Sequence, residues 1–166
     1  MDDTKDSRYS RAPEVEDLVA LCKALNESGA AYILIGGFAV ILHGSVRTTK
    51  DIDFLVDASI ANMQKVKNGM KSLPDNAVAQ VNDDDVQKYE VVRVADEIVV
   101  DLMAKACGID YQHAKSEIQM IIIEGVQIPF ASKELLVRMK NTVRPEDKID
   151  LKFLKWRIEE EKKGFI

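Results

Sequence analysis

The chain has 166 residues, which is the size of a single domain. With 46% hydrophobic and 31% charged residues it has the composition of a folded globular protein, which argues against wholesale disorder. Its 28 acidic and 23 basic residues give a net charge of −5, which argues against a protein that coats nucleic acid through clustered Lys and Arg. Two cysteines are too few for a disulfide scaffold, and no Cys or His cluster predicts a zinc site.

The sequence carries no sign of a membrane or export segment. Its first residues, MDDTKDSRYSR, are polar and acidic, so we expect neither a signal peptide nor a transit sequence. The longest apolar stretch, residues 30–42, is interrupted by Gly36-Gly37 and is too short to span a bilayer. We therefore expect a cytoplasmic protein without a membrane partner.

Apolar spacing and turn residues divide the chain into short elements. We expect residues 1–12 to form a flexible tail and residues 13–166 a single domain, with a core over 13–131 and a C-terminal helical segment over 132–166. In chain order the pattern predicts a helix over 13–28, a strand over 32–35, a short helix over 38–43, a strand over 51–56, a helix over 58–73, hairpins of 91–94 with 98–103 and of 120–124 with 126–130, and helices over 133–140 and 145–160. The fold class is α+β, a mixed β-sheet flanked by helices.

The last predicted helix combines an apolar stripe with two acids. Ile149, Phe153 and Trp156 recur at helical spacing, and we expect their side chains to pack in the core. Asp147 and Asp150 stand three residues apart just after Pro145, where acids favour the positive end of the helix dipole.

Asp51 and Asp53 are the strongest chemical signal, because they stand two residues apart on a predicted strand. Both carboxylates then project from one face, about 7 Å apart at their Cα atoms. Carboxylates this close repel one another unless a cation or a proton lies between them, and Mg²⁺ prefers such oxygen ligands. Asp101 lies in a second apolar run, where an acid is costly to bury. If the two strands are neighbours, three acids converge and could hold two metal ions; the alternative is a solvated strand face.

Two further features sit beside these acids. Gly36-Gly37 at a strand-to-helix turn lets the backbone approach a phosphate, although a simple tight turn uses the same residues. Arg47, Thr48 and Lys50 lead directly into the acidic strand, where a triphosphate would need donors. The alternative is a solvated loop in which Arg47 pairs with a nearby acid.

These residues together resemble a known family. Gly36-Gly37, a gap of thirteen residues, Asp51-Ile52-Asp53 in an apolar strand and the later Asp101 are similar to the signature of the DNA polymerase β-type nucleotidyltransferase superfamily. The stretch GGFAVILHGSVRTTKDID resembles its minimal bacterial branch, which includes abortive-infection nucleotidyltransferase toxins and small antibiotic nucleotidyltransferases. The segment IPFASKELL and the residues after it resemble the closing helices of that branch.

The resemblance implies a nucleotidyltransferase-like fold that transfers a nucleoside monophosphate from an NTP, such as ATP, with Mg²⁺ or alternatively Mn²⁺ as cofactor. Asp51 and Asp53 would bind both metals of a two-metal mechanism, and Asp101 would bind the metal that activates the acceptor hydroxyl and accept its proton. The nucleotide-binding set that the resemblance implies is Gly36, Gly37, Arg47, Thr48, Lys50, Lys140 and Asp147.

One position departs from the family pattern. Gly37 stands where many members of the superfamily carry Ser, so a hydroxyl for the triphosphate would have to come from Ser45, Thr48 or Thr49.

The sequence leaves the identity of the acceptor open. The leading hypothesis is a toxin-like enzyme that modifies RNA or protein, with a cognate antitoxin as a further partner. The alternatives are a small-molecule (antibiotic) nucleotidyltransferase, or an inactive member of the same fold that binds a nucleotide or a partner protein. Residues 132–166 hold 10 basic and 7 acidic side chains, a net charge of +3, so a basic helical segment follows an acidic core and could contact phosphate.

Overall fold

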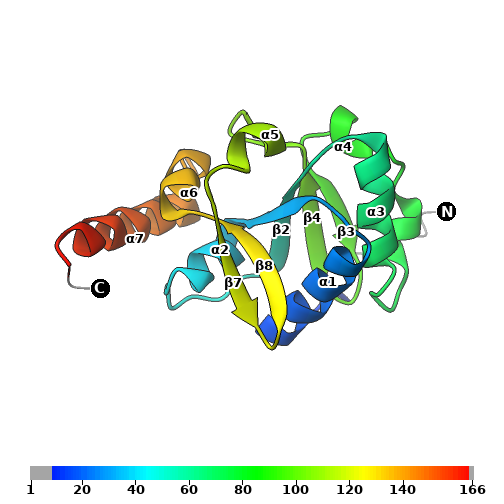
Figure 1. Cartoon of the computed structure of the whole chain (residues 1–166), viewed down its shortest axis with the longest axis horizontal. Helices are drawn as coiled ribbons and strands as arrows, with labels where there is room; N and C mark the ends of the chain where they lie inside the picture. Colours follow the sequence, from blue (N-terminus) through cyan, green and yellow to red (C-terminus); the bar gives the residue numbers. More distant parts are fainter. Residues whose placement is uncertain (1–8, 165–166) are drawn as a thin grey trace.

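The computed structural model describes residues 9–164 and has a six-stranded mixed sheet at its centre, with helices around it (Figure 1). The strands of this sheet are β1 (Tyr32–Ile35), β2 (Asp51–Val56), β3 (Val92–Ala95), β4 (Val99–Met103), β7 (Ile118–Ile123) and β8 (Val126–Ala131). The longer helices are α1 (Val15–Glu27), α2 (Gly36–Leu42), α3 (Ile60–Met70), α6 (Lys133–Met139) and α7 (Pro145–Lys162). Short elements complete the chain: a 3₁₀ turn (Ala77–Gln80), α4 (Asp85–Lys88), α5 (Tyr111–Ala114) and a two-stranded ribbon of β5 (Lys105–Ala106) and β6 (Ile109–Asp110). The α+β prediction is confirmed.

The sheet order is β3-β4-β2-β1-β8-β7, so β2 lies near its centre. β2 runs antiparallel to β1 and parallel to β4, and β1 runs parallel to β8. Both predicted hairpins form, as the antiparallel pairs β3–β4 and β7–β8. The parallel pairing of β2 with β4 joins two segments that are about fifty residues apart, and it brings the two acid-bearing strands side by side.

The pleat of β2 separates an apolar face from an acidic one. Ile52 and Phe54 are fully buried, whereas the alternating Asp51 and Asp53 are only partly buried. Phe54 meets the ring of Tyr32 edge-on at a centroid distance of 5.1 Å, and the Tyr32 hydroxyl donates to Asn26 of α1 at 2.7 Å. Phe54 therefore points to the face that α1 covers, and the acids point to the opposite face.

The chain is already attached to the sheet before α1 begins. Within the tail expected over 1–12, residues 1–8 lie outside the described residues. Ser10 Oγ donates to the carbonyl of Asp96 at 2.6 Å, and the Arg11 backbone N–H donates to the carbonyl of Glu97 at 3.0 Å. The segment just before α1 thus binds to the β3–β4 turn.

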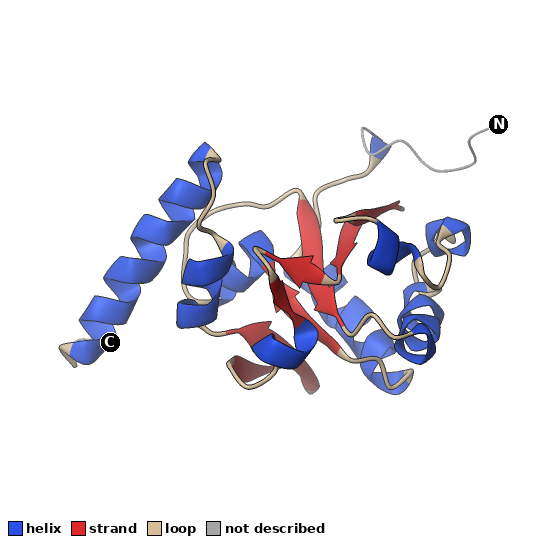
Figure 2. Cartoon of the chain, turned by 90° about the horizontal axis from the view of Figure 1, so that it is seen from above, coloured by secondary structure: helices blue, strands red, loops and turns tan. Residues whose placement is uncertain are grey.

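Helix α7 contacts α6 and α2 and extends away from the sheet (Figures 1 and 2). Its buried side chains are Asp147, Asp150 and Leu154. The prediction that Ile149 and Trp156 pack in the core was wrong, because Ile149 is 71% exposed and Trp156 is 52% exposed, whereas Phe153 is partly buried and packs against the core as expected. The helix buries the face that carries its two acids, since they find cationic partners on the body of the protein.

None of the helices within residues 9–164 is both long and apolar enough to cross a membrane.

Candidate active site

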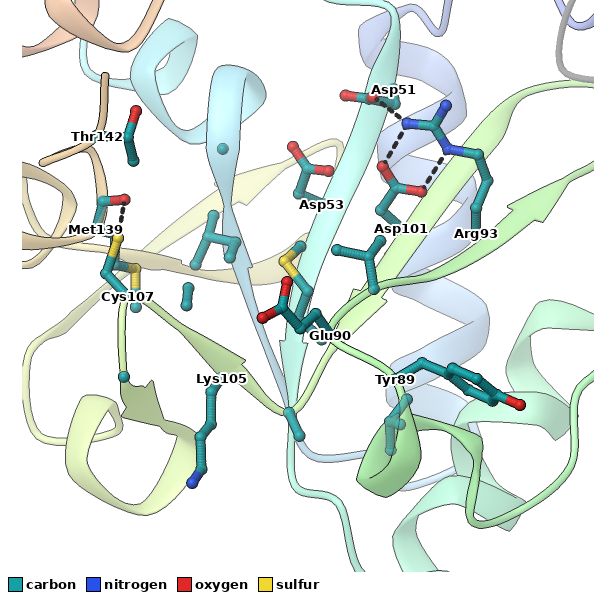
Figure 3. A pocket seen from close by; sticks show the side chains of 18 of the residues that line it. Asp51, Asp53, Tyr89, Glu90, Arg93, Asp101, Lys105, Cys107, Met139 and Thr142 are labelled. Carbon is teal, nitrogen blue, oxygen red and sulfur yellow. Dashed lines mark hydrogen bonds and ion pairs between the residues drawn. The ribbon is translucent and has the colours of Figure 1, made fainter. Parts of the chain in front are cut away.

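A cleft of about 910 Å³ opens on the acidic face of the sheet (Figure 3). Its wall includes the ends of β2, β3 and β4, the segment from Gln87 to Val91 and the ribbon around Cys107. The connection between α6 and α7 closes the other side, with Thr142 and Arg144 among the lining residues. The cleft therefore joins the sheet to the C-terminal helical segment.

Three carboxylates meet at the base of this cleft. Asp53 of β2 is directly opposite Asp101 of β4 in the parallel register, and Asp51 lies two residues before Asp53 on the same face. One oxygen from each acid lies within 4.8 Å of the others. Within residues 9–164 this is the only group of three acids, cysteines or histidines close enough to share a metal ion.

The charges of these acids perturb one another. Burial, together with the neighbouring charges of Asp51 and Asp101, raises the pKa of Asp53 to about 8. Burial and the charge of Asp101 also raise the pKa of Asp51. A hard divalent cation would stabilise the ionised form of these closely spaced carboxyl groups. Their oxygens are therefore a ligand set that fits Mg²⁺ or Mn²⁺.

Sequence reasoning missed Arg93 of β3, which is the cation of this cluster. Its Nε and one terminal nitrogen each donate to one oxygen of Asp101 at 2.9 Å, and the same terminal nitrogen lies 3.3 Å from Asp51 Oδ2 (Figure 3). Arg93 is paired with Asp101 across the antiparallel β3–β4 ladder. The predicted hairpin held part of this signal: a turn over 95–97 would place Arg93 opposite Val99, whereas the observed register places it opposite Asp101, two residues further along the same face.

The glycine turn lies directly against the acids. Gly36 has a φ of +70°, a left-handed conformation that favours glycine, and a Cβ there would overlap Asp53 Oδ2. A Cβ on Gly37 would lie 2.9 Å from Thr49 Oγ1. Of the three hydroxyls that could replace the missing serine, the one of Thr49 therefore lies beside Gly37. Gly36 lines the cleft.

A buried ionic network joins the other predicted nucleotide-binding residues. Lys140 Nζ lies 3.0 Å from Asp150 Oδ2 and 3.3 Å from Asp147 Oδ1, and Arg47 donates to both oxygens of Asp150 at 2.6 and 2.7 Å. Thr142 Oγ1 donates to Asp147 Oδ2 at 2.5 Å.

Only part of the predicted nucleotide set lines the cleft. Lys140 and Asp147 belong to its lining, as Gly36 does. The described lining of the cleft does not include Gly37, Arg47, Thr48 or Lys50. Arg47 instead pairs with Asp150, which corresponds to the alternative of a pairing with a nearby acid, and Thr48 and Lys50 are exposed.

Comparison with known proteins identifies the fold that carries this cleft. No family model matches the sequence, and no curated protein matches it at the level of sequence. Among solved structures, the chain is similar to the lincomycin-bound lincosamide antibiotic adenylyltransferase LnuA, with a TM-score of 0.60 and 18% identity over 87% of this chain and 98% of that one. The chain has a nucleotidyltransferase fold.

Two further structures share the fold. A candidate nucleotidyltransferase of Thermotoga maritima (TM1012) matches with a TM-score of 0.55 and 15% identity, over 87% of this chain and 92% of that one. An antigenic nucleotidyltransferase-like protein of Paracoccidioides brasiliensis matches with a TM-score of 0.54 and 16% identity, over 90% of this chain and 78% of that one. At these identities the likeness is one of architecture.

Proposed function

We propose that this protein is a metal-dependent nucleotidyltransferase that moves a nucleoside monophosphate from an NTP to an acceptor hydroxyl. The observation that carries the proposal is the meeting of Asp51, Asp53 and Asp101 within 4.8 Å, on neighbouring strands of a nucleotidyltransferase fold. The pKa of Asp53, raised to about 8, supports a site that needs a cation to ionise fully.

In the proposed reaction, the acceptor oxygen forms a bond to the α-phosphorus while the bond from that phosphorus to the pyrophosphate oxygen breaks. The hydroxyl proton leaves to a carboxylate, and Asp101 is the candidate base, since each of its oxygens keeps a lone pair beside the hydrogen bond from Arg93. Asp51 and Asp53 would hold Mg²⁺ or Mn²⁺. A bound divalent ion there supplies positive charge that neutralises the triphosphate and the charge that develops on it.

The glycine turn and the α6–α7 connection are the proposed nucleotide side of the cleft. Gly36 lines the cleft, so its backbone is the candidate phosphate contact of the turn, and the Thr49 hydroxyl, which lies beside Gly37 and donates to the Asp51 carbonyl at 3.1 Å, is a candidate donor. Lys140 supplies a buried cation at the cleft wall, held by Asp147 and Asp150. We propose that Arg47 acts through Asp150, by fixing the helix that carries Asp147.

The proposed acceptor is RNA or protein, as in toxin-like members of the superfamily, which act beside a cognate antitoxin. The exposed side of α7 supports an anionic acceptor, because Lys148, Lys152 and Lys155 are all exposed there. The likeness to LnuA, which binds lincomycin, keeps a small-molecule acceptor as the second candidate.

The test is a label-transfer assay on the full chain. Purified protein is incubated with each α-³²P-labelled NTP, Mg²⁺ and one acceptor at a time: tRNA, a protein mixture or lincomycin. We expect labelled tRNA or protein, and Asp51→Ala and Asp53→Ala should each lower transfer more than about 100-fold, since each removes a metal ligand. Glu27→Ala, which removes an exposed acid on α1, is the matched control and should transfer as the wild type does.

Each result points to one of the hypotheses. Transfer that survives Asp51→Ala or Asp53→Ala contradicts the proposed metal ligands. Label on lincomycin alone favours the small-molecule enzyme. Nucleotide binding without transfer to any acceptor favours the inactive member of the fold.

A further inference from the structure

Arg93 lies in line with two of the three acids. In the sheet, Arg93 of β3 is opposite Asp101 of β4, and Asp101 is opposite Asp53 of β2. These three residues therefore form one row across three strands, on the face that carries the cleft. A cation in this row is positioned by the backbone register, in the same way as the acids.

The Arg93 guanidinium binds Asp101 and Asp51 and makes no hydrogen bond to Asp53. Arg93 occupies both oxygens of Asp101 and Oδ2 of Asp51. No residue in the described part of the chain donates a hydrogen bond to the Asp53 carboxylate. An ion between Asp51 and Asp101 would compete with Arg93 for the same oxygens, whereas an ion between Asp51 and Asp53 would not.

The surroundings favour a persistent pair between Arg93 and Asp101. The Asp101 side chain is only 7% exposed, so its charge has little access to water. A bidentate pair with a planar guanidinium is among the strongest hydrogen-bonded arrangements of a carboxylate, and Arg stays charged at any physiological pH. The charge of the cluster also fits one ion. Three ionised carboxylates and one guanidinium have a net charge of −2, which one divalent cation neutralises.

We propose that Arg93 permanently takes the place of one metal ion, so that the acid cluster binds a single divalent cation at Asp51 and Asp53. This inference rests on the proposed function and refines it, since the superfamily pattern implies two ions. Arg93 is then a resident cation between Asp51 and Asp101, and the divalent ion belongs to the side that faces Gly36.

The inference is tested by counting bound ions, without nucleotide and without turnover. The full chain is stripped with EDTA and titrated with Mn²⁺, and the free ion is measured by its electron paramagnetic resonance signal. We expect one Mn²⁺ per chain for the wild type and two for Arg93→Gln, which removes the guanidinium charge. Arg138→Gln, which removes an arginine paired with Glu117 outside the cleft, is the matched control and should bind one.

Thermal unfolding provides a second readout. Arg93→Gln should melt below the wild type in EDTA, because three carboxylates are left without their cation, and should gain more than the wild type when Mn²⁺ is added. An equal gain in the two proteins would overturn the inference.

The count in the wild type needs no variant, so it decides the question even if Arg93→Gln does not fold. Two ions in the wild type, or a single ion in a folded Arg93→Gln, overturn the role of Arg93 and leave the proposed function intact. No bound Mn²⁺ in the wild type overturns the role of Arg93 and leaves the proposed function to the label-transfer assay, because a site of two carboxylates completes the ligands of its ion with substrate phosphates.

Discussion

The replacement Asp150→Ala tests whether ion pairs hold α7 on the protein. The Asp150 side chain is 2% exposed and binds Arg47 at 2.6 Å and Lys140 at 3.0 Å. Its removal leaves Lys140, which is 10% exposed, with Asp147 at 3.3 Å as its remaining acid. Breaking a buried ion pair costs about 3–5 kcal/mol. Because Arg47 can reach water, we expect the lower end, about 3 kcal/mol, and a fall in Tm of about 6–12 °C for a chain of this size.

The assay is urea unfolding followed by circular dichroism, with a control on the same helix. Glu159→Ala breaks an exposed pair with Lys162, and exposed pairs contribute about 0–1 kcal/mol, so this variant should unfold close to the wild type. In the double-mutant cycle of Arg47→Ala with Asp150→Ala, we expect a coupling energy above about 1 kcal/mol. A loss below about 1 kcal/mol for Asp150→Ala, with no coupling, would refute the reasoning.

Two further predictions concern backbone strain and a buried thiol. Gly36→Ala should lower stability more than Gly125→Ala and should weaken Mn²⁺ binding, since both have positive φ but only the Cβ at Gly36 meets Asp53; equal losses in urea unfolding would contradict this. Burial raises the pKa of Cys22 to about 12 from an ordinary value near 9, so its contribution to stability is complete below pH 9 and declines as pH rises toward 12, by about 1.4 kcal/mol at pH 10. Urea unfolding between pH 7 and 10 measures the decline, Cys22→Ala should reduce it, and Ellman's reagent should modify the exposed Cys107 in the folded protein but Cys22 only after unfolding.

The sheet and its acids were accessible to sequence reasoning because their signals are local. Strict alternation in residues 51–54 identifies the strand and the face on which Asp51 and Asp53 lie. Asp101 in an apolar run indicates a buried acid, and a buried acid calls for a partner. The step that local patterns do not supply is the parallel pairing of β2 with β4, which joins distant segments; the resemblance implied that the three acids act together, but not the direction of the strands.

The errors on α7 arise from a competition between two kinds of burial. Hydrophobicity favours Ile149 and Trp156 as the buried face, and both are exposed. Asp147 and Asp150 are buried instead, because Lys140 at the end of α6 and Arg47, about a hundred residues earlier in the chain, compensate the cost of desolvation. The sequence of the helix shows its acids but not the cations on other segments that pair with them, so it does not predict which face is buried.

The shared register of β3, β4 and β2 makes the cleft an indicator of correct folding. A slip of one residue between β2 and β4 would turn Asp51 and Asp53 toward α1 and bring Ile52 and Phe54 to the solvent face, so the same error would destroy the core and the acid cluster together. Molecules with a slipped strand would then be both unstable and unable to bind Mn²⁺. In refolding, the number of ions bound per folded chain should therefore stay constant as the yield varies, which makes metal binding a measure of how many chains have paired their strands correctly.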